Sequence, residues 1–412
     1  MDIGFLKQYF TAVAAKQLTA VEADPSISNQ HEYNGVSLFK SMFGTSPWRQ
    51  QIPTDFIYVS DEDDLIESDG VLTWYDARYN HPTRTEWRLY YPSNDVTTRA
   101  QAGDTLFICR KTDGTVLEII AKNGDLIENQ LYWLFDIKPE DTEKRFVATD
   151  LSNLPADSLT FTAKMILQRI GIELPLLQTV YLEMLIDQFG DAFPTTREFS
   201  QFARSTVKDV DPENAPDQAL MKWYEREEEM FMCMERHLIQ ERLRTGFMKD
   251  ETVDVDAFIQ FSLSVNNRRK SRAGLSLENH LEALFTLNRI RYSHTPITEN
   301  KSKPDFLFPS IENYRDREFP AHMLTMLGSK TTAKDRWRQV LEEADRIEHK
   351  HLITLEAAIS ENQTDEMKSR MLQLVVPKPI HATYTANQQT WLYSVADFLD
   401  LVRERQAYAD RA

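Results

Sequence analysis

The spacing of apolar and polar residues divides the chain into two differently patterned halves. Residues 1 to about 150 alternate short runs rich in β-branched and aromatic side chains with turn residues, for example at 71–75 (VLTWY) and 105–109 (TLFIC), a pattern typical of β-strands. Between two such runs the pair Asp113-Gly114 indicates a hairpin, because Asp-Gly suits the backbone of a tight turn. This half is predicted to be a mainly β barrel or pseudobarrel.

Helical spacing replaces the strand pattern from about 155 to 245, interrupted by the proline-containing stretch 211–216. Residues 253–412 then alternate helix and strand, and Ser276 is expected to be the N-cap of the helix that carries Leu277. Strands are expected at 305–308, 323–329, 351–355 and 371–376, and helices at 334–348 and 394–405. The pattern predicts an α/β sheet with helices on its faces.

These patterns predict two domains joined by a linker. With 412 residues and 42% hydrophobic composition, the chain is long enough for more than one core. We place a front domain at 1–155, a linker at 156–175 and a second domain at 176–412. No apolar stretch reaches the roughly 20 residues that a membrane span needs, and the two cysteines lie far apart, with no His or Cys at metal-ligand spacing. A protein of the reducing cytoplasm, without a membrane, is expected.

The distribution of charge changes what the total charge suggests. A net charge of −17 taken alone argues against a nucleic-acid-binding protein, because phosphate contacts need clustered lysine and arginine. Residues 262–350, however, hold 16 Lys and Arg against 12 Asp and Glu. The cations are densest where Arg268, Arg269, Lys270 and Arg272 fall within five residues. This cluster fits either a solvated loop or a clamp for DNA phosphates.

Two residues at neighbouring strand ends suggest hydrolytic chemistry. Asp305 opens one predicted strand and Lys330 closes the next, so a carboxylate and an ammonium could meet there. Such a carboxylate can hold Mg²⁺, which polarises a phosphodiester and activates water, while the lysine stabilises the developing negative charge. Taken alone, the two residues also fit a turn followed by a solvated lysine, so both interpretations stay open.

The residues after Lys330 are chemically suited to reading DNA. Lys334, Asp335 and Arg336 are expected at the start of a helix, from which side chains can enter the major groove. Lysine and arginine bind O6 and N7 of guanine, and aspartate accepts a hydrogen bond from N4 of cytosine, so the triplet suits adjacent G·C pairs. A salt-bridged first turn of an ordinary helix explains the same residues equally well.

Four blocks across residues 266–347 resemble the catalytic domain of the EcoRII-type restriction endonucleases, a branch of the PD-(D/E)XK nucleases. The blocks are NRRKSRAG at 267–274, SLE and HLE within 276–282, KPDFLFPS at 303–310, and KTT, RQ and EAD within 330–345. Four blocks in order are far more specific than the pair of Asp305 and Lys330 or the triplet at 334–336 alone. The resemblance implies a restriction-endonuclease-like α/β domain that cuts double-stranded DNA with Mg²⁺.

The resemblance also implies roles for single residues. Asp305 would be a metal ligand, Lys330 the catalytic lysine, and Glu343 a second acidic metal ligand carried by the following helix. Here the chain departs from the usual motif, because a glycine stands two residues before Lys330, where most relatives of this superfamily have Asp or Glu. Glu278 and Tyr314 match two further positions of the family's active site, and each also suits a surface position.

Recognition residues follow from the same resemblance. The triplet at 334–336 would read the outer G·C pairs of a short palindromic site of the CC-centre-GG type. Relatives flip the central bases with an arginine and an aromatic residue on an upstream helix, whereas the matching positions here hold Tyr224 and Glu228, with Trp223 adjacent. Trp223 or Tyr224 is a candidate for stacking on an extruded base, and packing between helices is the alternative.

The front half fits the DNA-binding domain of the same family, a pseudobarrel of the plant B-three type. The stretch 28–35 (SNQHEYNG), which includes His31, is similar to a first recognition arm, and the segment that contains Arg78, Arg84 and Arg88 is similar to a strand-turn-strand leading to a second. The three arginines are candidates for contacts with phosphates or base edges. Each of them alone also suits an ordinary surface position.

Residues and resemblance together predict a type II restriction endonuclease, of the type IIE class, that acts as a homodimer and leaves 5′-phosphates. Two-fold protein symmetry suits a palindromic site. In relatives the front domain binds a second copy of the site and relieves autoinhibition, so two DNA copies and a cognate methyltransferase in the host are expected. Two alternatives stay open: a DNA-binding protein of this fold that does not cut, and a nuclease for modified DNA.

Overall fold

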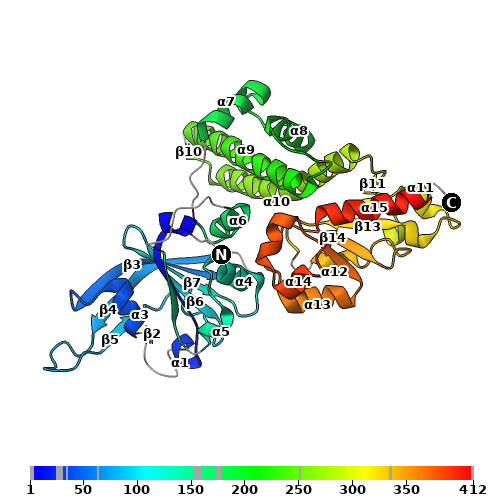
Figure 1. Cartoon of the computed structure of the whole chain (residues 1–412). Coiled ribbons are helices and arrows are strands. Elements are labelled where there is room, and N and C mark those ends of the chain that lie inside the picture. Colours follow the sequence, from blue (N-terminus) through cyan, green and yellow to red (C-terminus); the bar gives the residue numbers. More distant parts are fainter. Residues whose placement is uncertain are drawn as a thin grey trace. The chain divides into compact units, whose positions relative to one another are not determined.

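The chain folds into two compact units, Met1–Leu174 and Pro175–Ala412 (Figure 1). The computed structural model describes residues 4–24, 31–33, 36–62, 65–143, 145–151, 160–172, 178–249, 252–333 and 336–409. Within these residues, an eight-stranded sheet forms the centre of the first unit and a five-stranded sheet forms the centre of the second.

The first unit is built on a mixed sheet with the strand order β2-β5-β4-β3-β7-β6-β1-β8. Its strands are β1 (Phe10–Gln17), β2 (Glu32–Tyr33), β3 (Arg49–Val59), β4 (Ile66–Asp76), β5 (Trp87–Tyr90), β6 (Thr105–Lys111), β7 (Val116–Ala121) and β8 (Val147–Asp150). Neighbours are antiparallel, apart from the parallel pair β3 and β7. The predicted Asp-Gly hairpin is confirmed between β6 and β7, where Gly114 has a φ of 89° that glycine adopts without strain.

Two hydrophobic cores lie on opposite faces of this sheet. The helices of the unit are η1 (Gly4–Gln8), α1 (Ala20–Ala23), α3 (Val36–Phe43), α4 (Leu126–Leu134), α5 (Pro139–Thr142) and α6 (Phe161–Arg169). Alternate residues of a strand point to opposite faces, so Phe107 and Ile119 join a core with α4 and α6, and Ile108 and Ile120 join a core with α3. The strands agree with the mainly β prediction for this half, and their closure into a pseudobarrel stays a prediction.

The structure differs from the predicted linker at 156–175. Helix α6 lies inside that range, and its residues Ile166 and Leu167 are only 2% and 0% exposed because they pack into a core of the first unit. A helix with one apolar face needs a surface to cover that face. Residues 160–172 therefore belong to the first unit rather than to a spacer.

The second unit begins with a group of helices. They are α7 (Gln178–Phe189), α8 (Thr196–Thr206), α9 (Pro216–Thr245) and α10 (Val255–Leu287), and a small hairpin of β9 (Met248–Lys249) and β10 (Thr252–Val253) joins the last two. The proline at the start of α9 occupies the first helical turn, a position where its missing N–H costs nothing. The predicted helical region is confirmed. In the described part of the chain, no helix combines the length and the apolar character that crossing a membrane requires.

One long helix replaces the shorter one that was expected to begin at Ser276. Helix α10 has 33 residues, and its N-cap is Asp254, whose side chain accepts a hydrogen bond from the N–H of Ala257. Ser276 is fully buried inside the helix, so its prediction as an N-cap is wrong. Contacts with α8 and α9 stabilise the continuous helix, and the basic cluster therefore lies on a helix and not on a loop.

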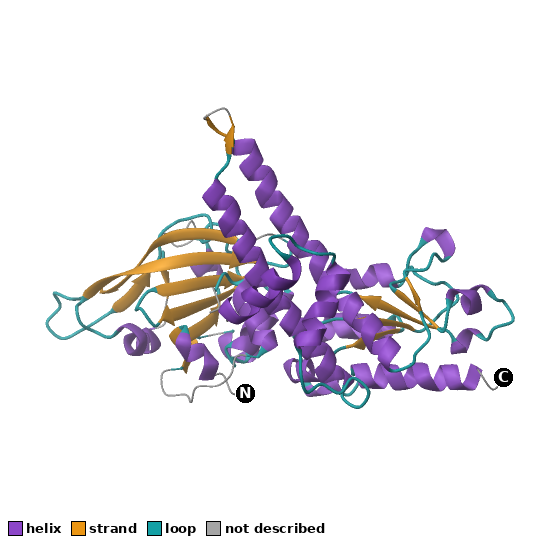
Figure 2. Ribbon diagram, turned by 90° about the horizontal axis from the view of Figure 1, so that it is seen from above, coloured by secondary structure: helices purple, strands orange, loops and turns teal. Residues whose placement is uncertain are grey.

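A five-stranded sheet of order β11-β12-β13-β14-β15 forms the rest of the second unit. Its strands are β11 (Ser293–His294), β12 (Phe306–Phe308), β13 (Thr325–Ser329), β14 (Lys350–Ile353) and β15 (Leu372–Val375). The first three are antiparallel and the last three parallel. The helices of this part include α11 (Ile311–Arg315), α12 (Trp337–Val340), α13 (Glu361–Ser369), α14 (Ala386–Gln389) and α15 (Val395–Ala409) (Figure 1). Figure 2 shows helices around the strands of this sheet. The predicted α/β arrangement is confirmed.

The helix expected at 334–348 is much shorter in the structure. Helix α12 has four residues, after which the chain turns and Ala344 adopts a φ of 52°. Four buried apolar side chains have the spacing of a helix and explain the expectation: Trp337, Val340, Ala344 and Ile347. The turn buries the same side chains that a helix would, so the spacing of apolar residues could not distinguish a turn from a helix. Glu343 consequently comes from a turn, which corrects its expected place on a helix.

Candidate active site

Asp305 and Lys330 come together where β12 begins and β13 ends. Because these strands are antiparallel, with Phe306 opposite Leu327, Asp305 lies beside the end of β13. Its Oδ2 accepts hydrogen bonds from Nζ of Lys330 at 2.7 Å and from the backbone N–H of Ser329 at 2.6 Å. The lysine and aspartate side chains are 21% and 15% exposed, so the ion pair can be reached from solvent.

The close approach of α12 explains the glycine that precedes Lys330 by two residues. A Cβ atom at Gly328 would lie 2.8 Å from the side chain of Val340, which is far inside van der Waals contact. An aspartate or glutamate at this position would therefore displace α12. A second acidic group for the site has to come from another segment.

Glu343 supplies a carboxyl group next to the ion pair. Burial and the neighbouring Asp305 carboxylate raise its pKa to about 7, while the positive charges of Lys330 and Lys350 act in the opposite direction. Its Oε2 atom is buried and has no hydrogen-bond partner. A buried carboxyl oxygen in this state is costly, and a bound cation between the two carboxylates would remove that cost.

The two carboxylates fit a hard divalent cation. Mg²⁺ prefers oxygen ligands and usually takes one or two carboxylates, completing its shell with water and with phosphate oxygens of the substrate. Asp305 and Glu343 offer such a set. In the described ranges no three His, Cys, Asp or Glu side chains gather into a metal site, so a metal shell here would depend on water and on a substrate phosphate.

Tyr314 holds the turn that carries Glu343. Its hydroxyl donates a hydrogen bond to Oε2 of Glu299 at 2.5 Å and accepts one from the backbone N–H of Arg346 at 3.2 Å. The Arg346 guanidinium donates to the carbonyl of Tyr314 and, at 2.8 Å, to that of Asp316. Burial raises the pKa of Tyr314, so the hydroxyl stays a donor. These hydrogen bonds tie Tyr314 to Arg346, three residues after Glu343. No motif in the sequence pointed to Arg346.

Glu278 is held by a histidine that the sequence did not single out. Nε2 of His294, on β11, lies 2.9 Å from Glu278, and Nδ1 lies 3.4 Å from Glu282. The hydrogen bond to Glu278 raises the pKa of His294. The imidazole stacks on Phe306, with ring centroids 5.1 Å apart. Phe306 directly follows Asp305 in the chain. Glu278 therefore contacts His294 on β11, the strand next to β12, whose first residue follows Asp305. No contact between Glu278 and Asp305 is seen among the described residues.

Arg272 is the buried member of the basic cluster. It is 7% exposed, because its guanidinium pairs with Glu228 on α9 and lies 4.0 Å from the centroid of the Phe231 ring. Both contacts hold the guanidinium between α9 and α10, where it cannot reach a DNA phosphate. The expectation that Arg272 binds DNA is therefore corrected.

The other cations of the cluster are at least partly accessible. Arg268 lies 4.9 Å from the centroid of the Phe193 ring, and Arg269 pairs with Glu235 at 2.6 Å while keeping 57% of its side chain exposed. Lys270 is exposed. These three residues remain candidates for phosphate contacts.

The two candidates for base flipping are core residues. Trp223 and Tyr224 are each 3% exposed, and both rings face His280, with centroids 6.1 Å and 6.4 Å away. His280 is itself fully buried and lies 3.0 Å from Glu227. In this conformation neither aromatic ring can stack on an extruded base, so that expectation is corrected in favour of helix packing.

The described residues include Arg336 of the readout triplet, whereas Lys334 and Asp335 lie outside them. Arg336 directly precedes α12 and is exposed. Arg338, two residues later, is also exposed but pairs with Glu366 at 3.0 Å. An exposed guanidinium therefore lies a few residues after Lys330, where bound DNA could be contacted.

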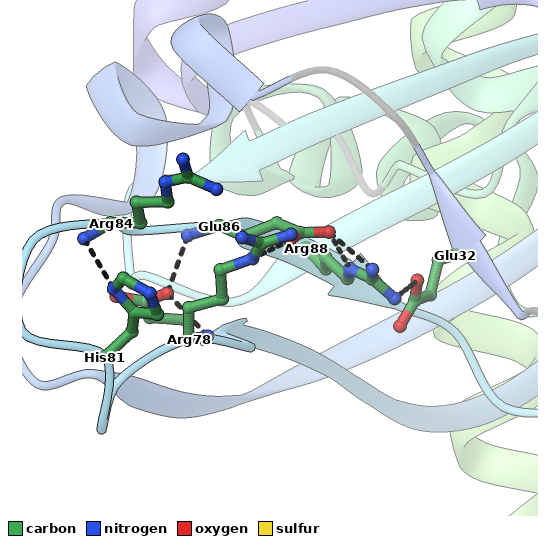
Figure 3. A network of polar contacts seen from close by, with 7 residues as sticks. Glu32, Arg78, His81, Arg84, Glu86 and Arg88 are labelled. Carbon is green, nitrogen blue, oxygen red and sulfur yellow. Dashed lines mark hydrogen bonds and ion pairs between the residues drawn. The ribbon is translucent and has the colours of Figure 1, made fainter.

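The candidate arginines of the first unit include two that share one carboxylate (Figure 3). Arg88 donates to Glu32 at 2.9 Å and to Glu86 at 3.0 Å, and Arg78 pairs with the other carboxylate oxygen of Glu86. The hydrogen bonds from Arg88 and Arg78 lower the pKa of Glu86. Arg84 is exposed, and Figure 3 shows its guanidinium pointing away from this network. Of Arg78, Arg84 and Arg88, Arg84 is therefore the most available to a ligand.

His31 lies at the described end of the first predicted arm, whose residues 28–30, 34 and 35 are outside the described ranges. Its ring centroid lies 5.4 Å from that of Tyr91, and its Nδ1 atom is buried without a hydrogen-bond partner. The backbone carbonyl of His31 accepts a hydrogen bond from Tyr91 at 2.9 Å. These contacts anchor the base of the arm to β5 and the residue after it.

Known proteins are similar to this chain in sequence. Residues 231–399 match the protein family described as EcoRII C terminal. Over 340 residues the chain is 33% identical to the type II restriction enzyme EcoRII of Escherichia coli. These residues cover 82% of this chain and 79% of that protein.

Two solved structures show weaker similarity. Metal-depleted Ecl18kI in complex with uncleaved, modified DNA has a TM-score of 0.44 and 19% identity, covering 56% of this chain and 85% of its own. The complex of restriction endonuclease PspGI with substrate DNA has a TM-score of 0.41 and 15% identity, covering 52% and 93%. The identity to EcoRII extends over most of both chains. This chain therefore belongs to the EcoRII family of type II restriction enzymes, which are site-specific deoxyribonucleases.

Proposed function

We propose that this protein cuts both strands of double-stranded DNA at a short palindromic site of the CC-centre-GG type, with Mg²⁺ as cofactor and 5′-phosphates as products. One observation carries the proposal. Asp305 and Lys330 form an ion pair at 2.7 Å, and beside it Glu343 has a buried carboxyl oxygen without a hydrogen-bond partner. The same three residues match the family's site.

The reaction needs few groups of the protein. When bound, Mg²⁺ polarises the scissile phosphate and activates water; Asp305 and Glu343 would hold it. A water oxygen forms a bond to phosphorus and the bond to O3′ breaks, which leaves the phosphate on the 5′ end. The ammonium of Lys330 stabilises the negative charge that develops on the phosphate oxygens, while Tyr314 keeps the Glu343 turn in place.

Arg336 is proposed to read one of the outer G·C pairs. Replacing it by alanine is expected to weaken specific binding by ~1 to 3 kcal/mol and to relax discrimination at that pair. Binding would be measured by competition with duplexes that carry single base-pair substitutions. Arg338→Ala is the matched control, because Arg338 already pairs with Glu366 and should leave specificity unchanged. Unchanged discrimination in Arg336→Ala would remove Arg336 from the readout.

The first unit is proposed to bind a second copy of the DNA site and so to relieve autoinhibition. Support comes from the exposed Arg84, whose guanidinium points away from the network that pairs Arg78 and Arg88 with Glu86 and Glu32 (Figure 3). A homodimer would match the two-fold symmetry of the site. The proposed setting is the cytoplasm of a host that protects its own DNA with a cognate methyltransferase.

Two other functions would use the same fold. A DNA-binding protein that does not cut would not need Asp305, Lys330 and Glu343 side by side, so their presence disfavours it. A nuclease for modified DNA would prefer methylated plasmid, whereas a restriction enzyme protected by a methyltransferase would prefer the unmethylated one. Digesting both plasmids distinguishes these cases.

Digestion of a plasmid library with sequencing of the ends tests the proposal. The purified protein with Mg²⁺ should produce discrete ends within CC-centre-GG sites, and Lys330→Ala, run in parallel, should produce none. The sequenced ends would also reveal the central base pair. An absence of cleavage with any divalent metal, even with added site-containing DNA, would favour the protein that binds without cutting.

A further inference from the structure

Glu118 is a fully buried carboxyl group in the first unit. It lies on β7, and its cross-strand neighbours are Phe56 on β3 and Ile108 on β6. Its side chain points, like those of Val116 and Ile120, into the core that α3 covers. A carboxyl group in an apolar core lowers stability unless a partner replaces its lost hydration. A buried group of this kind therefore calls for a functional explanation.

The partner of Glu118 is Tyr33, which belongs to β2 at the edge of the sheet. The Tyr33 hydroxyl donates a hydrogen bond to Oε1 of Glu118 at 2.7 Å. The Tyr33 ring stacks on Tyr91, with centroids 4.4 Å apart. Strand β2 has two residues, which pair with Leu89 and Tyr90 of β5. Because so short a strand forms few backbone hydrogen bonds, the buried side chain of Tyr33 contributes much of what holds β2 in place.

The opposite face of β2 contacts a candidate DNA-binding arginine. Glu32 precedes Tyr33, so its side chain points to the other face of the sheet. Its carboxylate accepts a hydrogen bond from Arg88 at 2.9 Å (Figure 3). Arg88 also donates to Glu86, which pairs with Arg78. A displacement of β2 would move the Glu32 carboxylate and so release Arg88 from the position in which this network holds it.

We infer that Glu118 and Tyr33 are positioning residues for DNA binding by the first unit. Their buried hydrogen bond holds β2, and β2 holds Arg88 through Glu32. The inference rests on the proposed function, in which the first unit binds a second copy of the DNA site. Glu118 and Tyr33 are 0% and 2% exposed, so they act on DNA through Arg88 and not by contact.

The proton on Glu118 strengthens this arrangement. Burial raises the pKa of Glu118 to about 8, while the hydrogen bond from Tyr33 acts in the opposite direction. Its Oε2 atom has no hydrogen-bond partner and is left to carry the proton. If β2 moved away and water entered, the pKa would return towards its ordinary value of 4.5. The contribution of the proton to holding β2 is therefore fully present below about pH 4.5 and is lost as pH rises through about 8.

Among the described residues, no cation pairs with Glu118 to hold it as a carboxylate. Besides Tyr33, the titratable or charged residues on the same face of the sheet or beside β2 are His31, Tyr91, Glu22, Lys16, Tyr58 and Arg110. Lys16 pairs with Glu22 at 2.5 Å. The Arg110 guanidinium lies 5.8 Å from the centroid of the Phe43 ring. Ionising Glu118 would therefore add a negative charge to this core without a paired cation.

Stimulation of cleavage by added DNA tests the inference in the full chain. The substrate is a plasmid with one site, and the activator is a short duplex that carries the site found by sequencing the ends. Glu118→Leu removes the acceptor for the Tyr33 hydroxyl and should need at least about 10-fold more activator for half-maximal cleavage. Its maximal rate at saturating activator should equal that of the unmodified protein, because Glu118 lies outside the active site.

Two further variants separate positioning from general damage to the fold. Glu118→Gln keeps an oxygen that accepts the hydrogen bond of Tyr33, so it should need no more activator than the unmodified protein. Glu67→Gln, at an exposed position of β4, is the matched control and should also change nothing. If Glu118→Leu needs no extra activator, or if its loss appears in the maximal rate instead, the inference is wrong.

Hydrogen exchange measures the position of β2 without DNA. The Tyr91 amide donates to the carbonyl of His31 at 2.9 Å, so a displacement of β2 exposes this amide. Its exchange rate in the unmodified protein, divided by that in Glu118→Gln at the same pH, should rise at least about 10-fold between about pH 6 and about pH 8. The ratio cancels the intrinsic pH dependence of exchange. A ratio that stays constant would overturn the inference.

The outcomes distinguish this inference from the proposed function. If the duplex stimulates cleavage and the Glu118 variants respond to it like the unmodified protein, the inference is wrong and the proposed function stands. If the duplex stimulates neither the unmodified protein nor any variant, the proposed binding of a second DNA copy is wrong, and the inference fails with it.

Discussion

Asp305→Ala is expected to reduce DNA cleavage by at least about 1,000-fold, because a bound metal supplies several kcal/mol of transition-state stabilisation and this change removes one of its two proposed ligands. Specific DNA binding should survive, since Asp305 faces Lys330 and Ser329 and is not proposed to touch a base. Single-turnover cleavage with Mg²⁺ and binding without a divalent metal would measure the two effects separately.

Two controls separate chemistry from folding. Asp305→Asn keeps an oxygen that can accept the hydrogen bonds of Lys330 and Ser329, so it should fold normally and still lose cleavage. Asp365→Ala removes an exposed carboxylate from α13 and should change nothing. Loss of specific binding in a correctly folded Asp305→Asn would count against the assignment of Asp305 as a metal ligand.

Glu343→Gln is expected to produce the second large effect, together with a change in pH dependence. The pKa of Glu343 is raised to about 7 by burial and by Asp305, and a metal ligand must be deprotonated, so a proton competes with Mg²⁺ below that value. At low Mg²⁺, cleavage by the unmodified protein should rise with pH through about 7, and more Mg²⁺ should move the rise to lower pH. Glu343→Gln should lose at least about 100-fold in activity and lose this rise.

The same carboxyl group should lower stability at high pH. Its folded pKa of about 7 lies above the ordinary value of 4.5, so the folded state holds the proton more tightly and this contribution is lost as pH rises through about 7. Glu343→Gln should therefore raise the melting temperature at about pH 8 more than at about pH 5. Glu342→Gln, at the exposed neighbour, is the control and should show no such pH-dependent difference. Equal shifts for both variants would contradict the raised pKa of Glu343.

The sequence by itself determined the elements and part of the chemistry. Strand periodicity and an Asp-Gly turn predicted the sheet of the first unit, and alternating helix and strand patterns predicted that of the second, because these signals depend only on neighbouring residues. Asp305 and Lys330 could be paired for the same reason, since each stands at the end of a recognisable strand. The resemblance to the family pointed to Glu343, but not to the turn that carries it.

Tertiary structure alone decided which polar and aromatic groups are accessible. Arg272 was expected to contact DNA and Tyr224 was a candidate for stacking on a base, yet the folded chain buries both between α9 and α10. The sequence shows what a side chain can do, but its burial depends on partners far along the chain, such as Glu228 for Arg272.

The state of Glu343 was decided in the same way. Helical spacing was compatible with both a helix and a turn around it. Val340 leaves no room for a side chain at Gly328, the position at which the usual PD-(D/E)XK motif has its acidic residue. The raised pKa of Glu343 then arises from burial beside Asp305. Electrostatic interactions of this kind depend on distance in space and on access of water, and neither is written in the order of residues.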